Sequence, residues 1–186
     1  MTPLIGLDHQ ADVLRVCLAQ HLPALLIGET GAGKTSLARQ VAQERGQELV
    51  RVNLDGGSTP DELVGRYQLK GHETMFEKGI IPYAMAKGAM LLLDELNAAL
   101  PDTLFVIHAL LEQEPRLLIP ETGEELKPQE GFTIVATCNP SHEYAGTKAI
   151  NPALYSRFGV VLRFEPLMGE SLMKALLGHV PDIGAE

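Results

Sequence analysis

Residues 28–35 read GETGAGKT and fit the phosphate-binding pattern GxxxxGK[ST]. Glycines in such a loop let successive backbone amides face an anion, and the helix expected to follow points its positive end at the same place. Lys34 is spaced to reach the outer phosphates of a nucleotide, and Thr35 to offer its hydroxyl to Mg²⁺. We therefore expect a nucleotide to bind the segment made of Gly28, Glu29, Thr30, Gly31, Ala32, Gly33, Lys34, Thr35 and Ser36.

Two carboxylates, Asp94 and Glu95, end the apolar run MLLL. The carboxyl end of a buried strand faces the ligand crevice in open α/β sheets. There Asp94 can hold Mg²⁺ through water, and Glu95 can polarise a water for in-line attack on the γ-phosphate. The alternative interpretation is that the pair only caps the next helix. A kinase does not need an adjacent base of this kind, so the pair favours ATP hydrolysis over phosphoryl transfer.

Two further polar residues follow at positions where this chemistry would use them. Asn139, in TIVATCNP, ends another apolar run and could hydrogen-bond the attacking water or the γ-phosphate. Arg157, in NPALYSRF, precedes the last apolar run and could stabilise charge on the phosphoryl group in transfer. Taken alone, an Asn before Pro is typical of a turn, and an Arg on a short helix is typical of a solvated surface.

The elements that must position these residues are five short apolar strands separated by helical segments. The strands are ALLIG, ELVRVNL, AMLLL, FTIVAT and GVVLRF. Such alternation predicts a three-layer α/β domain with a mostly parallel five-stranded sheet. Residues 66–88, with Gly71, Gly79, Pro82 and Gly88, indicate a loop and hairpin, and residues 116–130 a hairpin that turns near Gly123.

The bulk composition narrows the class of protein. The 186 residues, 45% of them hydrophobic, suit one main domain. A net charge of −9 and the absence of Trp argue against a basic nucleic-acid-binding face. Cys17 and Cys138 lack metal-ligand spacing, and no apolar run approaches the ~20 residues that span a bilayer. We expect a soluble cytoplasmic protein without a membrane span and with nucleic acid an unlikely partner.

The ordered motifs GETGAGKT, LLLDE, ATCNP and NPALYSRF resemble those of the AAA+ ATPases, which have a P-loop NTPase core. The chain is most similar to the branch of MoxR proteins, CbbQ and NorQ activators, dynein and midasin. The connecting stretches NLDGGSTPDELVGRY and FEKGIIPYAMAKGAMLLLDELNAA support this narrower resemblance. It covers residues 4–164.

The resemblance implies roles that composition does not give. Residues 28–35 would be the Walker A loop, Asp94 and Glu95 the Walker B pair, and Asn139 the sensor. Arg157 would be the arginine finger and act on ATP held by a neighbouring subunit in a homo-oligomeric ring, usually a hexamer. ATP and Mg²⁺ would be the cofactors, and LIGL at 4–7, with Ile5 and Gly6, would line the adenine pocket. Hairpins in 66–88 and 116–130 would face a pore or substrate.

The resemblance also implies a protein client that ATP turnover remodels or activates, with a von Willebrand type A domain protein as a possible partner. One departure concerns the lid. We expect an ATPase core at 1–165, followed at 166–186 by only the start of a helical lid, with no assignable second sensor arginine. A trimmed core, a short natural member and a poor hydrolase all fit this tail. Two other functions stay open: a nucleic-acid-associated motor or loader, and a nucleotide-binding scaffold with little turnover.

Overall fold

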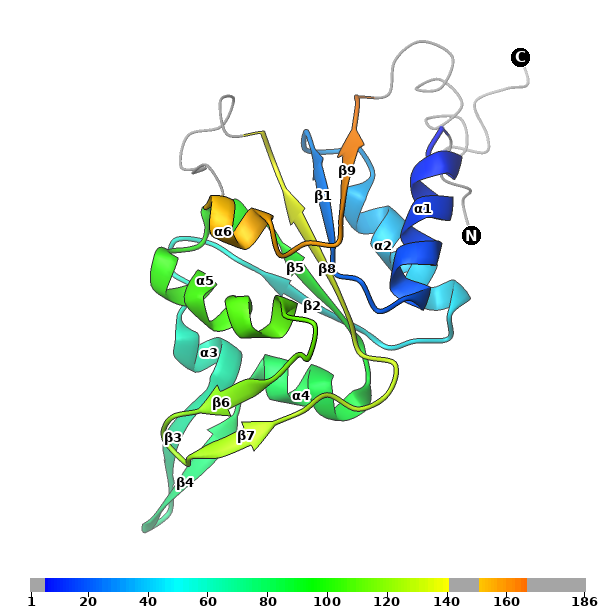
Figure 1. Ribbon diagram of the computed structural model, residues 1–186. Coiled ribbons are helices and arrows are strands. Elements are labelled where there is room, and N and C mark those ends of the chain that lie inside the picture. The colour runs from blue at the N-terminus through cyan, green and yellow to red at the C-terminus, as the bar shows by residue number, and fades with distance from the viewer. Residues whose placement is uncertain (1–5, 141–150, 167–186) are drawn as a thin grey trace, which may run out of the picture.

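A five-stranded parallel sheet forms the centre of the computed structural model, which describes residues 6–140 and 151–166 (Figure 1). The strand order is β2-β5-β8-β1-β9, and every neighbouring pair is parallel. The bounds are β1 (Ala24–Gly28), β2 (Leu49–Asn53), β5 (Met90–Asp94), β8 (Thr133–Cys138) and β9 (Val160–Phe164). The predicted sheet is confirmed in strand number and in its parallel direction.

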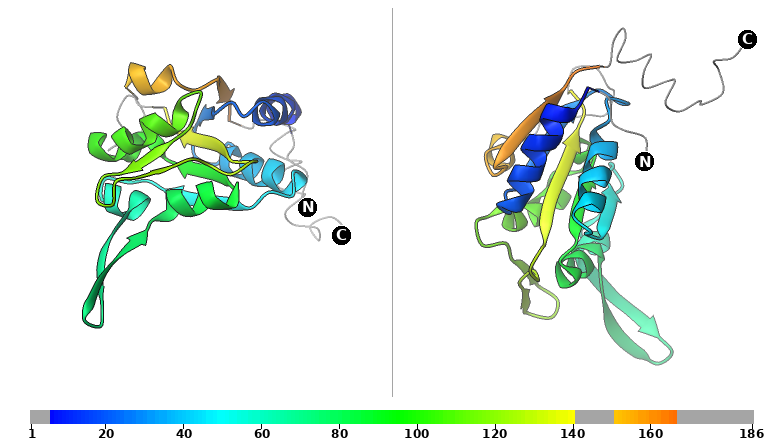
Figure 2. Two further views of the ribbon diagram at one scale, coloured as in Figure 1. Left: turned by 60° about the horizontal axis from the view of Figure 1, so that its bottom comes forward. Right: turned by 90° about the vertical axis from the view of Figure 1, so that its right-hand side faces the viewer.

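Helices cover both faces of this sheet, because successive strand side chains point to opposite sides. Leu26, Leu92 and Val135 face the layer made by α1 (Asp8–Ala19) and α2 (Lys34–Glu44). Leu25 and Leu91 face the other layer. That layer contains α3 (Pro60–Val64), α4 (Ile80–Lys87), α5 (Pro101–His108) and α6 (Pro152–Tyr155), with the short 3₁₀ turns η1 (Leu96–Ala98) and η2 (Ala109–Leu111). The predicted three-layer α/β fold is therefore present (Figure 2).

The segment 66–88 contains more regular structure than the predicted loop and hairpin. The hairpin is β3 (Gly65–Lys70) with β4 (Glu73–Lys78), and helix α4 follows at once. Pro82 had argued against a helix here. It lies in the first turn of α4, where backbone N–H groups have no partner within the helix and proline is tolerated. The helix ends at Gly88, which adopts the left-handed conformation, and the buried Met85 anchors it to the core.

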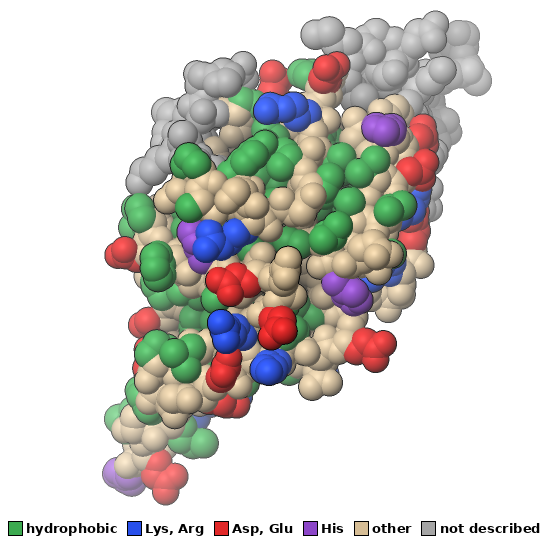
Figure 3. Space-filling model, in the orientation of Figure 1, with side chains coloured by type: hydrophobic (Ala, Val, Ile, Leu, Met, Phe, Trp, Pro, Cys, Tyr) green, Lys and Arg blue, Asp and Glu red, His purple; other side chains and the backbone are tan. Residues whose placement is uncertain are grey.

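The second predicted hairpin is confirmed as β6 (Leu117–Ile119) with β7 (Glu124–Leu126). It lies against the first hairpin through an ion pair of 2.9 Å between Lys78 Nζ and Glu124 Oε1. The β3–β4 hairpin projects from the body of the domain (Figure 2). On the face shown in Figure 3, acidic and basic side chains are intermixed without a large area of one sign. No helix in the described ranges has the length and apolar character to cross a membrane.

Candidate active site

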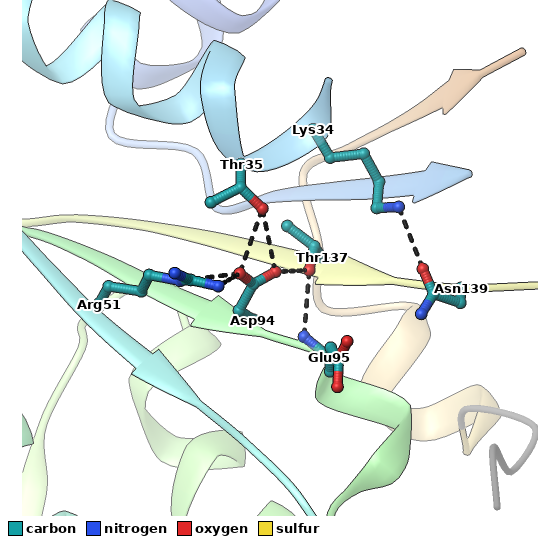
Figure 4. A network of polar contacts seen from close by, with 7 residues as sticks. All are labelled: Lys34, Thr35, Arg51, Asp94, Glu95, Thr137 and Asn139. Carbon is teal, nitrogen blue, oxygen red and sulfur yellow. Dashed lines mark hydrogen bonds and ion pairs between the residues drawn. The ribbon is translucent and has the colours of Figure 1, made fainter. Parts of the chain in front are cut away.

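A cavity of about 240 Å³ opens at the carboxyl ends of β1, β5 and β8. It brings together nearly all the residues singled out from the phosphate loop and from the Asp94 and Asn139 motifs, with two residues that were not predicted, Arg51 and Thr137 (Figure 4). The lining consists of Thr30, Gly31, Gly33, Lys34, Thr35, Ser36, Arg51, Asp94, Glu95, Thr137 and Asn139.

The phosphate loop joins β1 to α2 through glycines that other residues could not replace without strain. Gly31 and Gly33 have φ values of 85° and 87°, in the left-handed region that favours glycine. Gly28 ends β1 against β9, where an added Cβ would lie 2.7 Å from the Phe164 carbonyl oxygen. Ala32 is buried, and its N–H donates to the Glu29 carbonyl at 3.2 Å. The loop is thus held at its start by β9 and in its middle by this turn.

Lys34 is 7% exposed, and its amine has three acceptors within the protein. It donates to the backbone carbonyls of Gly28 (2.6 Å) and Glu29 (2.7 Å) and to Asn139 Oδ1 (3.1 Å). Burial lowers the pKa of this amine, and the nearby acidic groups, among them Asp94, oppose that shift. A phosphate that binds Lys34 must therefore replace at least one of these acceptors.

Thr35 and Asp94, the two predicted Mg²⁺ ligands, lie within hydrogen-bonding distance of each other. The Thr35 hydroxyl donates to the two carboxylate oxygens of Asp94 at 3.1 and 3.3 Å. Asp94 is the last residue of β5 and only 4% exposed. A hydroxyl and a carboxylate at this separation present the oxygen ligands that Mg²⁺ prefers. The donor set therefore fits the ion.

Arg51 and Thr137 were missed, and both contact Asp94 from the strands on either side of β5. Arg51 donates to Asp94 Oδ2 from Nε at 2.9 Å and forms an ion pair through Nη2 at 2.6 Å. The Thr137 hydroxyl donates to Asp94 Oδ1. Each residue occupies a position that points to the α2 side of the sheet. The sequence signal that could have indicated them is a polar residue within an otherwise apolar strand.

Glu95 has a backbone conformation that is rare for a residue other than glycine, with φ 58° and ψ 42°. Its N–H donates to Thr137 Oγ1 at 3.1 Å. Residues in the left-handed region cost on the order of 1–3 kcal/mol and persist where the surroundings hold them. The Thr137 hydroxyl thus accepts from the Glu95 backbone while it donates to the Asp94 carboxylate, and it ties the two acidic residues together (Figure 4).

Asn139 is held in place by Asn97, a third residue that the sequence did not indicate. Asn97 is 3% exposed and donates from Nδ2 to the Asn139 carbonyl at 2.9 Å. In return, the Asn139 N–H donates to Asn97 Oδ1 at 3.4 Å. This pair leaves the Asn139 side chain directed at Lys34, on the cavity wall. Asn139, which directly follows the apolar strand β8, is therefore more than a turn residue.

Arg157 is not among the described residues that line this cavity. It follows α6 rather than lying inside it, and its Nη1 donates to the Ala153 carbonyl at 2.6 Å. The charge of Arg157 adds to burial in lowering the pKa of His108. Gly6 has φ 76° and is exposed, whereas Ile5 and residues 167–186 of the lid predicted at 166–186 lie outside the described residues.

Comparison with known proteins adds a family to this geometry. Residues 23–158 match the pattern of the family described as "AAA domain (dynein-related subfamily)". The chain is 36% identical to midasin of Giardia intestinalis over 87% of its own length and 3% of that protein. It is also 36% identical to protein NorQ of Paracoccus denitrificans over 84% of its length and 57% of NorQ.

A solved structure supports the fold independently. A crystal structure from Cytophaga hutchinsonii, provisionally described as an ATPase, matches with a TM-score of 0.76 at 19% identity. The match covers the whole of this chain and 54% of that one. The chain thus spans about half the length of NorQ and of this structure and a small part of midasin.

Proposed function

Because this chain belongs to the dynein-related subfamily of AAA domains, we propose that it binds ATP with Mg²⁺ and hydrolyses it. The observation that carries the proposal is the single cavity in which the phosphate loop, the Thr35–Asp94 pair and Glu95 meet. A loop that only made a structural turn would not need a buried lysine and two carboxylates at its mouth. These groups are sufficient for ATP hydrolysis and do not require a second substrate to accept the phosphoryl group, as a kinase would.

Each residue has a distinct task in this reaction. The backbone amides of residues 30–35 and the Lys34 amine bind the phosphates, and Thr35 with Asp94 holds Mg²⁺, which neutralises charge on the phosphate oxygens. Glu95 orients the attacking water and accepts its proton, and Asn139 holds the water or the γ-phosphate from the other side. Thr137 keeps Glu95 in position because its hydroxyl oxygen accepts a hydrogen bond from the Glu95 N–H.

Arg157 completes the proposal by acting outside its own cavity. Its charge acts on His108, which stacks against Phe105, a side chain that is 78% exposed. Tyr155, two residues before Arg157, is 37% exposed. Such a surface favours a contact with another copy of the chain. We infer that Arg157 serves the ATP of a neighbouring subunit in a ring, with six subunits as the expected number. An Arg supplied from a neighbour stabilises the charge of the transition state.

Turnover in such a ring would remodel or activate a protein client, with a von Willebrand type A domain protein as a candidate partner. ATP and the two free, buried cysteines fit a cytoplasmic location. A nucleic-acid motor is the competing function. The net charge of −9 and the intermixed charges in Figure 3 weigh against it. Strong stimulation of ATP hydrolysis by DNA or RNA would reverse this preference.

The assignment of Glu95 is tested by phosphate release from the wild type and from Glu95→Gln. We expect the variant to bind ATP as before and to lose hydrolysis, because its amide cannot accept the proton of water. Glu112→Gln, which changes an exposed carboxylate away from the cavity, is the matched control and should keep full activity. Equal rates for wild type and Glu95→Gln would exclude this role. ATP binding without hydrolysis by the wild type would favour a nucleotide-binding scaffold.

The shared site is tested by complementation between two inactive variants. Arg157→Ala keeps Glu95 but lacks the finger, and Glu95→Gln supplies the finger but lacks the base. We expect each alone to be inactive and a mixture to recover activity, because some interfaces then combine Glu95 of one subunit with Arg157 of the next. Activity of the wild type should also rise more than linearly with protein concentration. A mixture that stays inactive would contradict the shared site.

A further inference from the structure

The Asp94 carboxylate is saturated by donors from three directions. Thr35 contacts both of its oxygens, Thr137 donates to Oδ1, and Arg51 takes Oδ2 through Nε and Nη2. Three of these contacts fall on Oδ2. Any cation that approaches this oxygen from the cavity must therefore displace a donor that is already bound.

Arg51 is the donor best placed to leave. The side chain of Asp94 is 6% exposed, but that of Arg51 is 47% exposed and reaches its partner from the rim of the cavity. Thr35 and Thr137, by contrast, hold Asp94 from α2 and β8, which are fixed in the core. A half-exposed guanidinium can turn into solvent at little cost, whereas the threonines cannot move without their backbones.

The register explains how Arg51 reaches this position. Asn53 of β2 pairs with Asp94 of β5, and Arg51 lies two residues earlier on the same strand. It therefore points to the same face of the sheet as Asp94, and its long side chain extends along that face toward the carboxyl end. The contact spans the two strands diagonally, which only a side chain of this length can do.

Two cations that contact the same carboxylate oxygen lie close enough to repel each other. We propose that Arg51 is a positioning residue that balances the charge of Asp94 in the ligand-free protein and gives up the carboxylate to Mg²⁺. This inference rests on the proposed function of the site. Loading of Mg²⁺ is then an exchange of one cation for another, and Arg51 sets how much Mg²⁺ strengthens nucleotide binding.

The first test measures binding rather than activity. All variants carry Glu95→Gln so that ATP is not consumed, and the Kd of ATP is measured once in EDTA and once in saturating Mg²⁺. The Kd in EDTA divided by the Kd in Mg²⁺ should be about fivefold or more larger for Arg51→Gln, because this change removes a competitor of Mg²⁺. Arg51→Lys keeps the charge and should give an intermediate ratio. Arg116→Gln removes an exposed arginine of a hairpin ion pair and should leave the ratio unchanged.

The second test uses the metal alone, without nucleotide. In EDTA, Arg51→Gln should unfold at a lower temperature than the wild type, because Asp94 then lacks its counter-charge. Mg²⁺ should raise the unfolding temperature of this variant more than that of the wild type. An unchanged or smaller ratio of Kd values, or an equal response to Mg²⁺, would show that Arg51 does not yield to the ion. Failure of the wild type to bind ATP at all would instead refute the proposed function, and the second test would still decide the role of Arg51.

Discussion

Replacement of Thr137 by valine tests how the two acidic residues of the site are held. Thr137 is 1% exposed, and valine has nearly the same shape. The change removes one hydroxyl that donates to Asp94 and accepts from the Glu95 N–H. The Glu95 N–H is left without its acceptor, at a cost of about 1–3 kcal/mol, and Asp94 loses one hydrogen bond worth about 1 kcal/mol while it keeps Thr35 and Arg51. We expect the free energy of unfolding to fall by about 2–4 kcal/mol, and Tm by roughly 4–16 °C for a chain of this size.

Catalysis should suffer more than nucleotide binding in the same variant. Without the hydroxyl, the strained backbone of Glu95 is free to relax, and a displacement of about 1 Å at a catalytic group costs up to roughly a hundredfold in rate. ATP binding measured in EDTA should change little, because Lys34 and the phosphate loop keep their contacts. Phosphate release and a binding titration separate the two effects.

Two variants provide the controls for this experiment. Thr137→Ser keeps the hydroxyl and loses a methyl group, so it should retain most of the activity. Thr133→Val alters a buried threonine at the other end of β8, whose hydroxyl reaches Gln47 Oε1 only at 3.4 Å, and should cost less than about 1 kcal/mol. If Thr137→Val is as stable and as active as Thr133→Val, the hydroxyl does not position Glu95.

Three further predictions follow from other contacts. Gly28→Ala should lower the free energy of unfolding by about 1–3 kcal/mol, because the added Cβ would lie 2.7 Å from the backbone of β9. Gly31→Ala should lower it by only about 1 kcal/mol, because its Cβ would lie in open space and only the φ of 85° opposes it. Urea unfolding measures both. Arg15 lowers the pKa of Glu44 to about 2, so the stabilisation from their pair is fully present above the ordinary pKa of 4.5 and is lost as the pH falls through about 2. Glu44→Gln should therefore lower the free energy of unfolding by under about 1 kcal/mol at pH 7 and by progressively less as the pH falls to 2. Burial raises the pKa of the Cys138 thiol to about 11, so iodoacetamide should label it at pH 8 only after unfolding, and rapid labelling of the folded protein would contradict this.

The sequence predicted the fold class and most of the cavity because its signals are local. A glycine-rich loop between an apolar strand and a helix specifies its own conformation, and Asp94 at the end of an apolar run specifies its own exposure to the crevice. The parallel sheet followed from the alternation of strands and helices. These inferences needed no knowledge of which strands are neighbours.

The roles of Arg51 and Thr137 could be predicted only with the order of the strands. The order β2-β5-β8-β1 places the strand of Arg51 on one side of Asp94 and the strand of Thr137 on the other. Nothing within ELVRVNL or TIVATCNP states this order, since Arg51 is 43 residues from Asp94 in sequence. Helix α4 was missed for a different reason: Pro82 is a helix breaker in most positions, and the exception depends on where the first turn begins.

The contacts of the ligand-free site bear on how a nucleotide can enter it. Lys34 has three internal acceptors, and Asp94 has Arg51 as its counter-charge, so both groups already have partners. Binding must then replace these partners, and its net free energy is the difference between new and old contacts rather than the sum of the new ones. A phosphate alone would free Lys34 from a carbonyl but leave Arg51 on Asp94. Only a ligand that brings both a polyphosphate and a divalent cation exchanges both sets of contacts together, which favours the nucleotide–metal complex over either component.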